Sequence, residues 1–284
     1  MTGDFRADLH CHTICSDGTE TPQTLIEMAS SMGLRGLSIT DHDTIEAYQE
    51  ALPFAKAKNF PLISGIEFSA VHNKTSVHIL AYSFPLPSPP IEQFCIRHHQ
   101  RRTERNQAIL DLLAYNGMPL TLEDFPDGLF SEQSHHSIGR PHIAMAMVKK
   151  GYVKSIQEAF QQHIGENKPS FASGESRFSV EETLEIIHQA NGLAVIAHPH
   201  LIDNVAILRD LLTMNFDGIE GYYARFPREQ QERWIKIGAR KGWLITGGSD
   251  FHGTIKPGNP LGSSWVNEET FNVLHQHFQR NQSI

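Results

Sequence analysis

The sequence predicts an α/β fold in which parallel strands alternate with helices. Seven short apolar segments have the length of strands, at residues 5–9, 34–40, 61–66, 77–82, 193–197, 218–221 and 243–246. Helix-start signals lie between several of these segments. Histidine or carboxylate residues follow most of them, and active sites in α/β folds form where the carboxyl ends of strands converge. We therefore expect these polar residues to meet at one end of the sheet.

The first four strands precede residue 85. A helix follows the first strand, because Thr21-Pro22 supplies a capping hydroxyl and a proline at the first helical position, and Gly33 closes the helix. A second helix is expected over 44–58, between the second and third strands. The third strand ends just before Glu67, and His78 lies inside the fourth. Prolines at 85, 87, 89 and 90 then mark a boundary, since they stop both helices and strand ladders.

Helix signals replace strands from residue 91 to about 177. Residues 91–114 are predicted to form one long helix, and Thr121 and Ser155 begin capping boxes. Gly139-Arg140-Pro141 is typical of a helix start. The strand and helix alternation resumes with the capping box at Ser179. We therefore expect residues 1–90 and 178–284 to form one α/β domain, and 91–177 to be a helical insertion that caps it and binds substrate.

Composition limits the classes of function. The 24 basic and 32 acidic residues give a net charge of −8, which argues against a general nucleic-acid-binding surface, so phosphate contacts must be local. No apolar run approaches the ~20 residues of a membrane span, and the first residues do not resemble a signal peptide. Three cysteines are too few for a disulfide framework. We expect a cytoplasmic protein with no membrane and no obligate protein partner.

Histidine is abundant, with 17 residues, and points to a metal site. His10 and His12 lie two positions apart after the first strand, so their side chains share a face; alone, they could be an ordinary surface pair. The other imidazoles and carboxylates make that interpretation poor, and the expected ligands are His10, His12, Asp17, His42, Glu67, His78, His198, Asp250 and His252. Such a set without thiolates suits several ions of Mn²⁺, Fe²⁺ or Zn²⁺, bridged by carboxylates such as Glu67 and Asp250.

Two kinds of neighbouring residue are expected to support these ligands without binding metal. Asp41 and Asp43 flank His42 and are expected to cap the following helix and orient the imidazole. Cys11 lies between two ligands and should therefore point to the opposite face of the first strand, into the core.

The motifs that carry these residues resemble those of the polymerase and histidinol phosphatase (PHP) superfamily of metal-dependent phosphoesterases. Besides His78, they are Asp8-Leu9-His10-Cys11-His12, Ser16-Asp17-Gly18, Thr40-Asp41-His42-Asp43, Gly65-Ile66-Glu67, Ala197-His198-Pro199 and Ser249-Asp250-Phe251-His252. The resemblance covers essentially the whole chain. It is greatest to the branch with a helical insertion between the fourth and fifth strands, which includes 3′,5′-nucleoside bisphosphate phosphatases and a bacterial 5′-to-3′ exoribonuclease.

This resemblance implies a distorted seven-stranded α/β barrel, (β/α)7, with a helical insertion and a centre of three divalent ions. Mn²⁺ is the expected metal, with Fe²⁺ or Zn²⁺ as alternatives. The implied ligand groups are His10, His12, Glu67 and Asp250 for one ion, Glu67, His78 and His198 for a second, and Asp17, His42 and His252 for a third. We expect Glu67, Asp250 and His200 to act in catalysis, although His200 could touch the substrate or only close its loop.

A basic face on the long helix is the candidate for binding a second phosphate. Arg97, Arg101 and Arg105 recur every four residues, with Arg102 and Asn106 one position round. Arg140 precedes Pro141 at a helix start, where free N–H groups favour anions. The alternative is a solvated basic face. We expect Arg101, Arg102, Arg105, Asn106, Arg140 and His200 to contact the substrate.

Three classes of function fit these residues unequally. A phosphoester hydrolase fits best, acting on a small nucleoside 3′,5′-bisphosphate to give a 5′-mononucleotide, or stepwise on the 5′ end of a short RNA. An amidohydrolase is a weaker alternative, because no lysine ends a strand to act as a carbamylated bridge. A non-catalytic metal-binding module is weakest, because it would not need all nine ligands.

Overall fold

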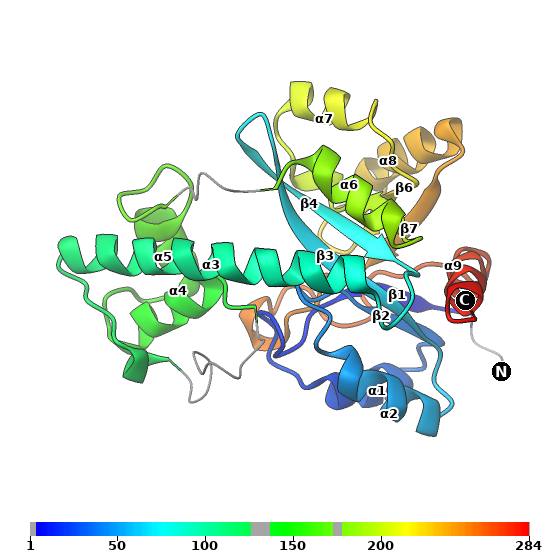
Figure 1. Cartoon of the computed structure of the whole chain (residues 1–284), viewed down its shortest axis with the longest axis horizontal. Helices are drawn as coiled ribbons and strands as arrows, with labels where there is room; N and C mark the ends of the chain where they lie inside the picture. Colours follow the sequence, from blue (N-terminus) through cyan, green and yellow to red (C-terminus); the bar gives the residue numbers. More distant parts are fainter. Residues whose placement is uncertain (1–3, 126–136, 173–177, 284) are drawn as a thin grey trace. The chain divides into compact units, whose positions relative to one another are not determined.

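The computed structural model describes residues 4–125, 137–172 and 178–283. The chain divides into two compact units. One unit, called here the barrel unit, combines Met1–Cys95 with Phe178–Ile284, and the other, called the insertion unit, is Ile96–Arg177. The barrel unit contains all seven strands described (Figure 1).

The seven strands form one sheet in chain order that nearly closes into a barrel. They are β1 (Ala7–Cys11), β2 (Gly36–Ile39), β3 (Leu62–His72), β4 (Thr75–Tyr82), β5 (Leu193–Ile196), β6 (Gly218–Tyr223) and β7 (Leu244–Gly248). Backbone hydrogen bonds bring the two ends of the sheet together. The Asp250 amide donates to the His10 carbonyl at 2.8 Å, and the His12 amide donates to the Phe251 carbonyl at 2.8 Å. A distorted seven-stranded α/β barrel is therefore confirmed.

The prediction of parallel strands throughout is wrong for β4. This strand pairs antiparallel with both β3 and β5, whereas the other neighbouring pairs are parallel. Only Asn73 and Lys74 separate β3 from β4, and both have positive φ values, 45° and 67°. Such a turn closes a hairpin, and two residues are too few for the crossover that parallel strands need.

The hairpin also corrects the end of the third strand, which continues to His72 instead of stopping at residue 66. Glu67 therefore lies inside β3. Because β4 runs in the opposite direction, the early part of β4 lies beside the later part of β3, and His78 pairs with Ser69. The antiparallel strand thus brings His78 to the region of Glu67.

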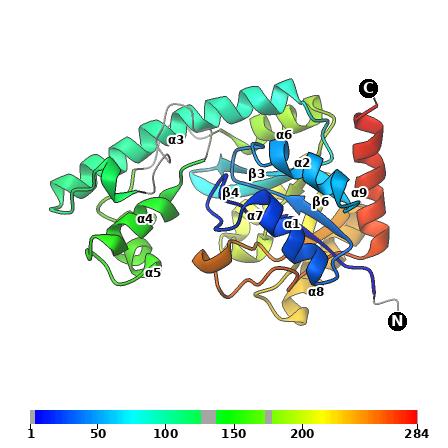
Figure 2. The ribbon, with the colours of Figure 1, turned by 90° about the horizontal axis from the view of Figure 1, so that it is seen from below.

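Helices surround the strands of the barrel unit (Figure 2). They are α1 (Pro22–Ser31), α2 (Tyr48–Ala57), α6 (Val180–Gln189), α7 (Val205–Leu211), α8 (Arg228–Lys241) and α9 (Glu268–Asn281). The caps expected from the sequence form: the Thr21 side chain accepts a hydrogen bond from the Thr24 amide, and that of Ser179 from the Glu182 amide. These bonds satisfy N–H groups that a helix start leaves unpaired.

The alternation of side chains along β1 separates site from core. Cys11 is fully buried in an apolar cluster that includes Leu25 and Ile39, as expected from its position between two ligands. His10 and His12 are also fully buried but point to the other face of the strand, toward other buried imidazoles and carboxylates. Packing thus fixes the strand that presents both imidazoles.

The insertion unit is helical in the part of the chain described. The long helix α3 (Pro89–Tyr115) contains the boundary between the units, and α4 (Arg140–Lys149), α5 (Ile156–Ala159) and a π-helical turn (Phe160–Ile164) follow it. Ile109, Leu113, Ile143 and Met147 belong to its apolar core. The capping box at Thr121 is followed by a 3₁₀ turn, Leu122–Asp124, and the Asp124 carboxylate accepts from both the amide and the hydroxyl of Thr121.

Candidate metal centre

All nine residues expected to bind metal lie in the barrel unit, and they converge. Their nitrogen and oxygen atoms form three overlapping groups, and within each group these atoms lie within 4.8 Å of one another. The groups are His10, His12, Glu67 and Asp250; His12, Asp17, His42 and His252; and His42, Glu67 and His78. His198 joins through Glu67. Compared with the grouping expected from the resemblance, His12 enters a second group and His42 approaches Glu67.

Glu67 lies at the middle of the cluster and is 1 % exposed. Its Oε2 atom lies 3.1 Å from both His10 Nε2 and His12 Nε2. Its Oε1 atom lies 2.8 Å from His78 Nδ1 and 2.8 Å from His198 Nε2. The Oε2 atom also lies 3.3 Å from His42 Nδ1. Each carboxylate oxygen thus faces a different set of imidazoles, which is the arrangement a bridging ligand requires.

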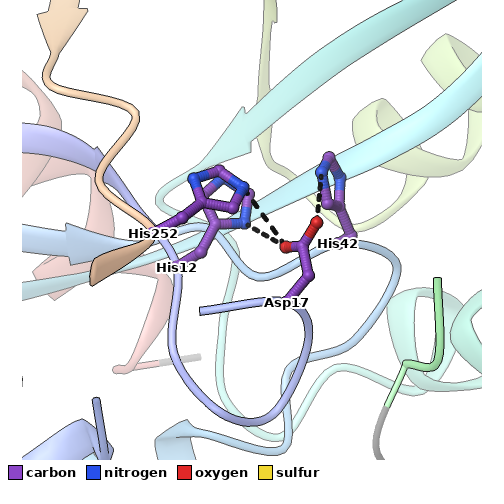
Figure 3. A group of neighbouring side chains, drawn as sticks. All are labelled: His12, Asp17, His42 and His252. Carbon is purple, nitrogen blue, oxygen red and sulfur yellow. Dashed lines mark ion pairs between the residues drawn. The ribbon is translucent and has the colours of Figure 1, made fainter. Parts of the chain in front are cut away.

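Asp17 is the centre of a second group (Figure 3). Its Oδ1 atom lies 3.2 Å from His252 Nε2 and 3.6 Å from His12 Nδ1, and its Oδ2 atom lies 3.9 Å from His42 Nε2. The His12 and His252 rings stack with centroids 3.9 Å apart. Residues from the β1–α1 loop, the end of β2 and the segment after β7 therefore meet around one carboxylate.

Asp250 is held by two residues that the sequence did not indicate. The Tyr223 hydroxyl donates to Asp250 Oδ2 at 2.7 Å, and Lys256 Nζ donates to the same oxygen at 3.0 Å. Tyr223 ends β6, and Lys256 follows the 3₁₀ turn Gly253–Ile255. Tyr223 lies 27 positions before Asp250 and Lys256 lies 6 positions after it, and no sequence pattern links either residue to Asp250.

Glu220 is the third residue that was missed, and it orients two ligands. Its Oε1 atom lies 2.9 Å from His10 Nδ1, and its Oε2 atom accepts from the His198 amide at 2.6 Å. Glu220 is fully buried. A carboxylate on the second ring nitrogen fixes the tautomer of a metal-binding histidine and the direction of its other nitrogen. The available signal was a lone charged residue inside the apolar strand β6.

The aspartates that flank His42 support the site in a different way from the one expected. The helix cap predicted for them does not form, because α2 begins after Ala47 and has no side-chain cap. Asp41 accepts hydrogen bonds from the hydroxyls of Thr13 and Ser16, both at 2.6 Å, and so fixes the loop that carries Asp17. Asp43 accepts from the Ser69 amide at 2.7 Å. Both carboxylates are buried but belong to none of the three groups of possible ligands.

The electrostatics of the cluster keep the carboxylates ionised. Burial alone would raise the pKa of Glu67, but the imidazoles of His42, His10 and His78 hold it well below its usual range. Neighbouring imidazoles, those of His252 and His42 first, likewise outweigh burial and hold the pKa of Asp17 well below its usual range. Burial lowers the pKa of His42 to about 3, which leaves its imidazole neutral. Ionised carboxylates and neutral imidazoles are the forms that bind metal.

Buried imidazole nitrogens without hydrogen-bond partners indicate that the nine predicted ligands fit divalent cations. His12 Nε2, His42 Nδ1, His198 Nδ1 and His252 Nε2 are buried and have no hydrogen-bond partner among the described residues. Three of them lie within 3.3 Å of a carboxylate oxygen of Glu67 or Asp17 but are not aligned for a hydrogen bond. Buried polar atoms normally have partners, and a cation between nitrogen and oxygen would supply one.

The expected substrate contacts lie in both units. In the insertion unit, Asn106 is buried and donates to the Ile138 carbonyl, while its own oxygen accepts from Arg105. Arg102 lies beside Gly139, the residue before α4, with Nη1 3.5 Å from the point where a β-carbon would stand. The Arg140 guanidinium packs over the rings of Phe160 and Phe171. Arg101 lies on α3. Substrate binding by these residues stays a prediction.

His200 is the expected contact in the barrel unit, in the 3₁₀ turn Pro199–Leu201. Its ring stacks on Phe226, with centroids 5.0 Å apart, and approaches Tyr223 and Trp234. Both ring nitrogens are buried without a hydrogen-bond partner among the described residues. Burial, with a smaller effect of His198, lowers the pKa of His200 to about 4. The side chain is therefore a neutral imidazole in an aromatic environment beside a predicted ligand.

None of the described helices is both long and apolar enough to cross a membrane.

The family model of the PHP domain matches residues 8–219. A 5′-3′ exoribonuclease of Haemophilus influenzae is 30% identical over 256 residues, which are 86% of this chain and 89% of that protein. A 3′,5′-nucleoside bisphosphate phosphatase of Chromobacterium violaceum is 28% identical over 260 residues, 90% of each chain.

The structure is also similar to a solved one, assigned as a metal-dependent phosphoesterase from Bifidobacterium adolescentis. Its TM-score is 0.84 at 32% identity, and the match covers 95% of this chain and 96% of that chain. The family match, the relatives and the fold agree with the clustered imidazoles and carboxylates. The chain belongs to the PHP family of metal-dependent phosphoesterases and is a phosphoric ester hydrolase.

Proposed function

We propose that this enzyme removes the 3′-phosphate of nucleoside 3′,5′-bisphosphates and releases 5′-mononucleotides. The observation that carries the proposal is the position of Glu67, whose two oxygens face different imidazoles at the centre of the cluster. A phosphate ester cleaved at such a centre needs no covalent intermediate with the protein. The phosphatase of C. violaceum, which aligns with 90% of the chain, supports the choice of substrate.

The cofactors proposed are three divalent ions, Mn²⁺ first and Fe²⁺ or Zn²⁺ as alternatives. Ions of this kind lower the pKa of a bound water molecule toward neutrality and polarise phosphoryl oxygens. The ligands are the nine residues above, with Glu67 shared between ions. Glu220 orients His10, and Asp41 fixes the loop of Asp17. We propose that His200 contacts the substrate near these ligands.

The second phosphate is proposed to bind to the insertion. Arg102, Arg105 and Arg140 supply guanidinium groups, which recognise phosphate oxygens through charge-assisted hydrogen bonds. Arg101 lies on the same helix. Asn106 positions Arg105, since its side chain joins that guanidinium to the Ile138 carbonyl. A local set of arginines on a chain with a net charge of −8 suits a small anionic substrate better than a long nucleic acid.

An exoribonuclease acting on short or 5′-monophosphorylated RNA ends is the second candidate. It requires the same contacts, one phosphate at the metal ions and another at arginines, and the H. influenzae relative bears that name.

We further propose that the enzyme works in the cytoplasm without an obligate protein partner. Its three cysteines, which form no disulfide, agree with a reducing compartment.

Purified protein with Mn²⁺ tests these proposals against each other. The substrates are adenosine 3′,5′-bisphosphate, a 5′-phosphorylated RNA oligonucleotide and a panel of amides. We expect the highest kcat/KM for the bisphosphate. Preference for the RNA would instead establish the exoribonuclease, and turnover of the amides alone would overturn the assignment to phosphate esters.

A further inference from the structure

The two carboxylate oxygens of Asp250 have different surroundings. The Oδ1 atom faces the cluster, at 3.5 Å from His10 Nε2, 3.4 Å from His12 Nε2 and 3.4 Å from His252 Nδ1. The Oδ2 atom instead accepts the hydrogen bonds of Tyr223 and Lys256. One oxygen is therefore directed at the ligands and the other at protein donors.

The two hydrogen bonds to Asp250 Oδ2 are short, and both end on a buried oxygen. Tyr223 is 1 % exposed, and its hydroxyl lies 2.7 Å from Oδ2. The Lys256 side chain is 39% exposed, and its ammonium group lies 3.0 Å from the buried carboxylate. A hydrogen bond from an ammonium to a carboxylate is among the stronger ones in proteins. To use Oδ2 for a metal ion, the protein would have to break both bonds.

The backbone fixes the same carboxylate from the other side. Asp250 has a φ of 54°, in the left-handed region that residues other than glycine rarely adopt. Its amide is held by the His10 carbonyl at 2.8 Å. The side chain is thus restrained at both the backbone and Oδ2, and only Oδ1 is left to face the imidazoles.

We propose that Tyr223 and Lys256 are a positioning pair that holds Asp250 Oδ2 away from the metal ions, so that Asp250 binds through Oδ1 alone. The inference rests on the proposed metal centre. Of the two carboxylates, Glu67 would then be the one that bridges ions, and Asp250 would bind through a single oxygen. A second oxygen from Asp250 would fill a coordination position that a water molecule or a phosphate oxygen of the substrate needs.

Binding of Co²⁺ to the metal-free protein tests this without relying on turnover. Co²⁺ absorbs visible light less strongly as its coordination number rises. In Lys256→Met and in the double variant with Tyr223→Phe, Asp250 is freed to bind through both oxygens. We expect a weaker visible band per bound ion and an affinity about ten- to a hundredfold lower. Lys256→Arg, which keeps the charge and the donors, should restore most of the wild-type spectrum.

Two matched controls separate this role from a general effect. Lys58→Met removes an exposed lysine that pairs with Glu27, and Tyr222→Phe alters the tyrosine next to Tyr223, which packs in an apolar cluster. The hydrogen bonds to Asp250 Oδ2 come instead from Tyr223 and Lys256. Both controls should bind Co²⁺ as wild type does. Unchanged spectra and affinities in the Lys256 and double variants, even with lower melting temperatures, would contradict the positioning role. Failure of the wild type to bind Co²⁺ would overturn the metal centre itself.

Discussion

At the scale of single residues, the site depends on carboxylates that serve more than one imidazole. The convergence of the candidate ligands was predictable, because histidines and carboxylates stand out where apolar strands end. Glu220, Tyr223 and Lys256 were not. Glu220 reaches His10 across 210 positions of sequence, and Lys256 reaches Asp250 from a turn without regular periodicity. Contacts of this kind follow from barrel closure and leave no spacing pattern.

Glu67→Ala is expected to lose more than one equivalent of metal and nearly all activity, since its two oxygens face separate sets of imidazoles. Elemental analysis after dialysis, with phosphate release from the bisphosphate, measures both effects. Cys11→Ser is the control, because Cys11 lies on the opposite face of β1, and it should keep its metals. Full metal occupancy in Glu67→Ala would remove this residue from the site.

Glu220→Gln is expected to lower metal affinity about ten- to a hundredfold, as other substitutions behind a metal-binding histidine do. The amide replaces the carboxyl partner of His10 Nδ1 with nearly the same shape. Titration with Mn²⁺ measures the change. Glu232→Gln, at a glutamate that pairs with Lys236 on the surface of α8, is the control. Equal affinities in both variants would show that Glu220 does not orient the ligand.

At the scale of elements, the hairpin of β3 and β4 is where sequence and structure differ most. Asn73-Lys74 lacks the Asn-Gly or Asp-Gly signature of a two-residue hairpin turn, so the short connection was not recognised. Without it, His78 looked like a histidine inside an ordinary parallel strand. The antiparallel pairing places His78 Nδ1 2.8 Å from Glu67 Oε1 and so completes one edge of the centre.

The insertion is expected to act on one phosphate only. Arg140→Ala should lower kcat/KM for adenosine 3′,5′-bisphosphate roughly ten- to a hundredfold, from the ~1.5 to 3 kcal/mol of a charge-assisted hydrogen bond to phosphate. An aryl monophosphate lacks the second phosphate and should be little affected. Equal losses on both substrates, with a lower melting temperature, would show instead that Arg140 serves to pack against Phe160 and Phe171.

At the scale of the whole molecule, the metal centre couples folding to pH. Burial lowers the pKa of His12, but Asp250, Glu67 and Asp17 raise it to about 9 from an ordinary 6.5. A group whose folded pKa is raised stabilises the protein below its unfolded pKa, and that contribution disappears as the pH rises through the folded value. The metal-free protein should therefore lose stability between about pH 6.5 and 9.

Bound cations should reduce this pH dependence, because an imidazole that binds metal cannot also bind a proton. Melting temperatures across this pH range, with a chelator and with saturating Mn²⁺, measure the difference. We expect a falling profile for the metal-free protein and a flatter, higher one with Mn²⁺. Identical profiles would mean that the buried imidazoles do not exchange protons for metal.

Phosphate release from adenosine 3′,5′-bisphosphate by metal-free protein titrated with Mn²⁺ tests the central claim most directly. That claim is that the imidazoles and carboxylates around Glu67 bind divalent ions that are required for phosphoester hydrolysis. We predict no release without metal and activity that rises and saturates as several equivalents bind. Equal release by the metal-free protein, kept in a chelator strong enough to remove all metal, and by the protein saturated with Mn²⁺ without chelator would contradict the account.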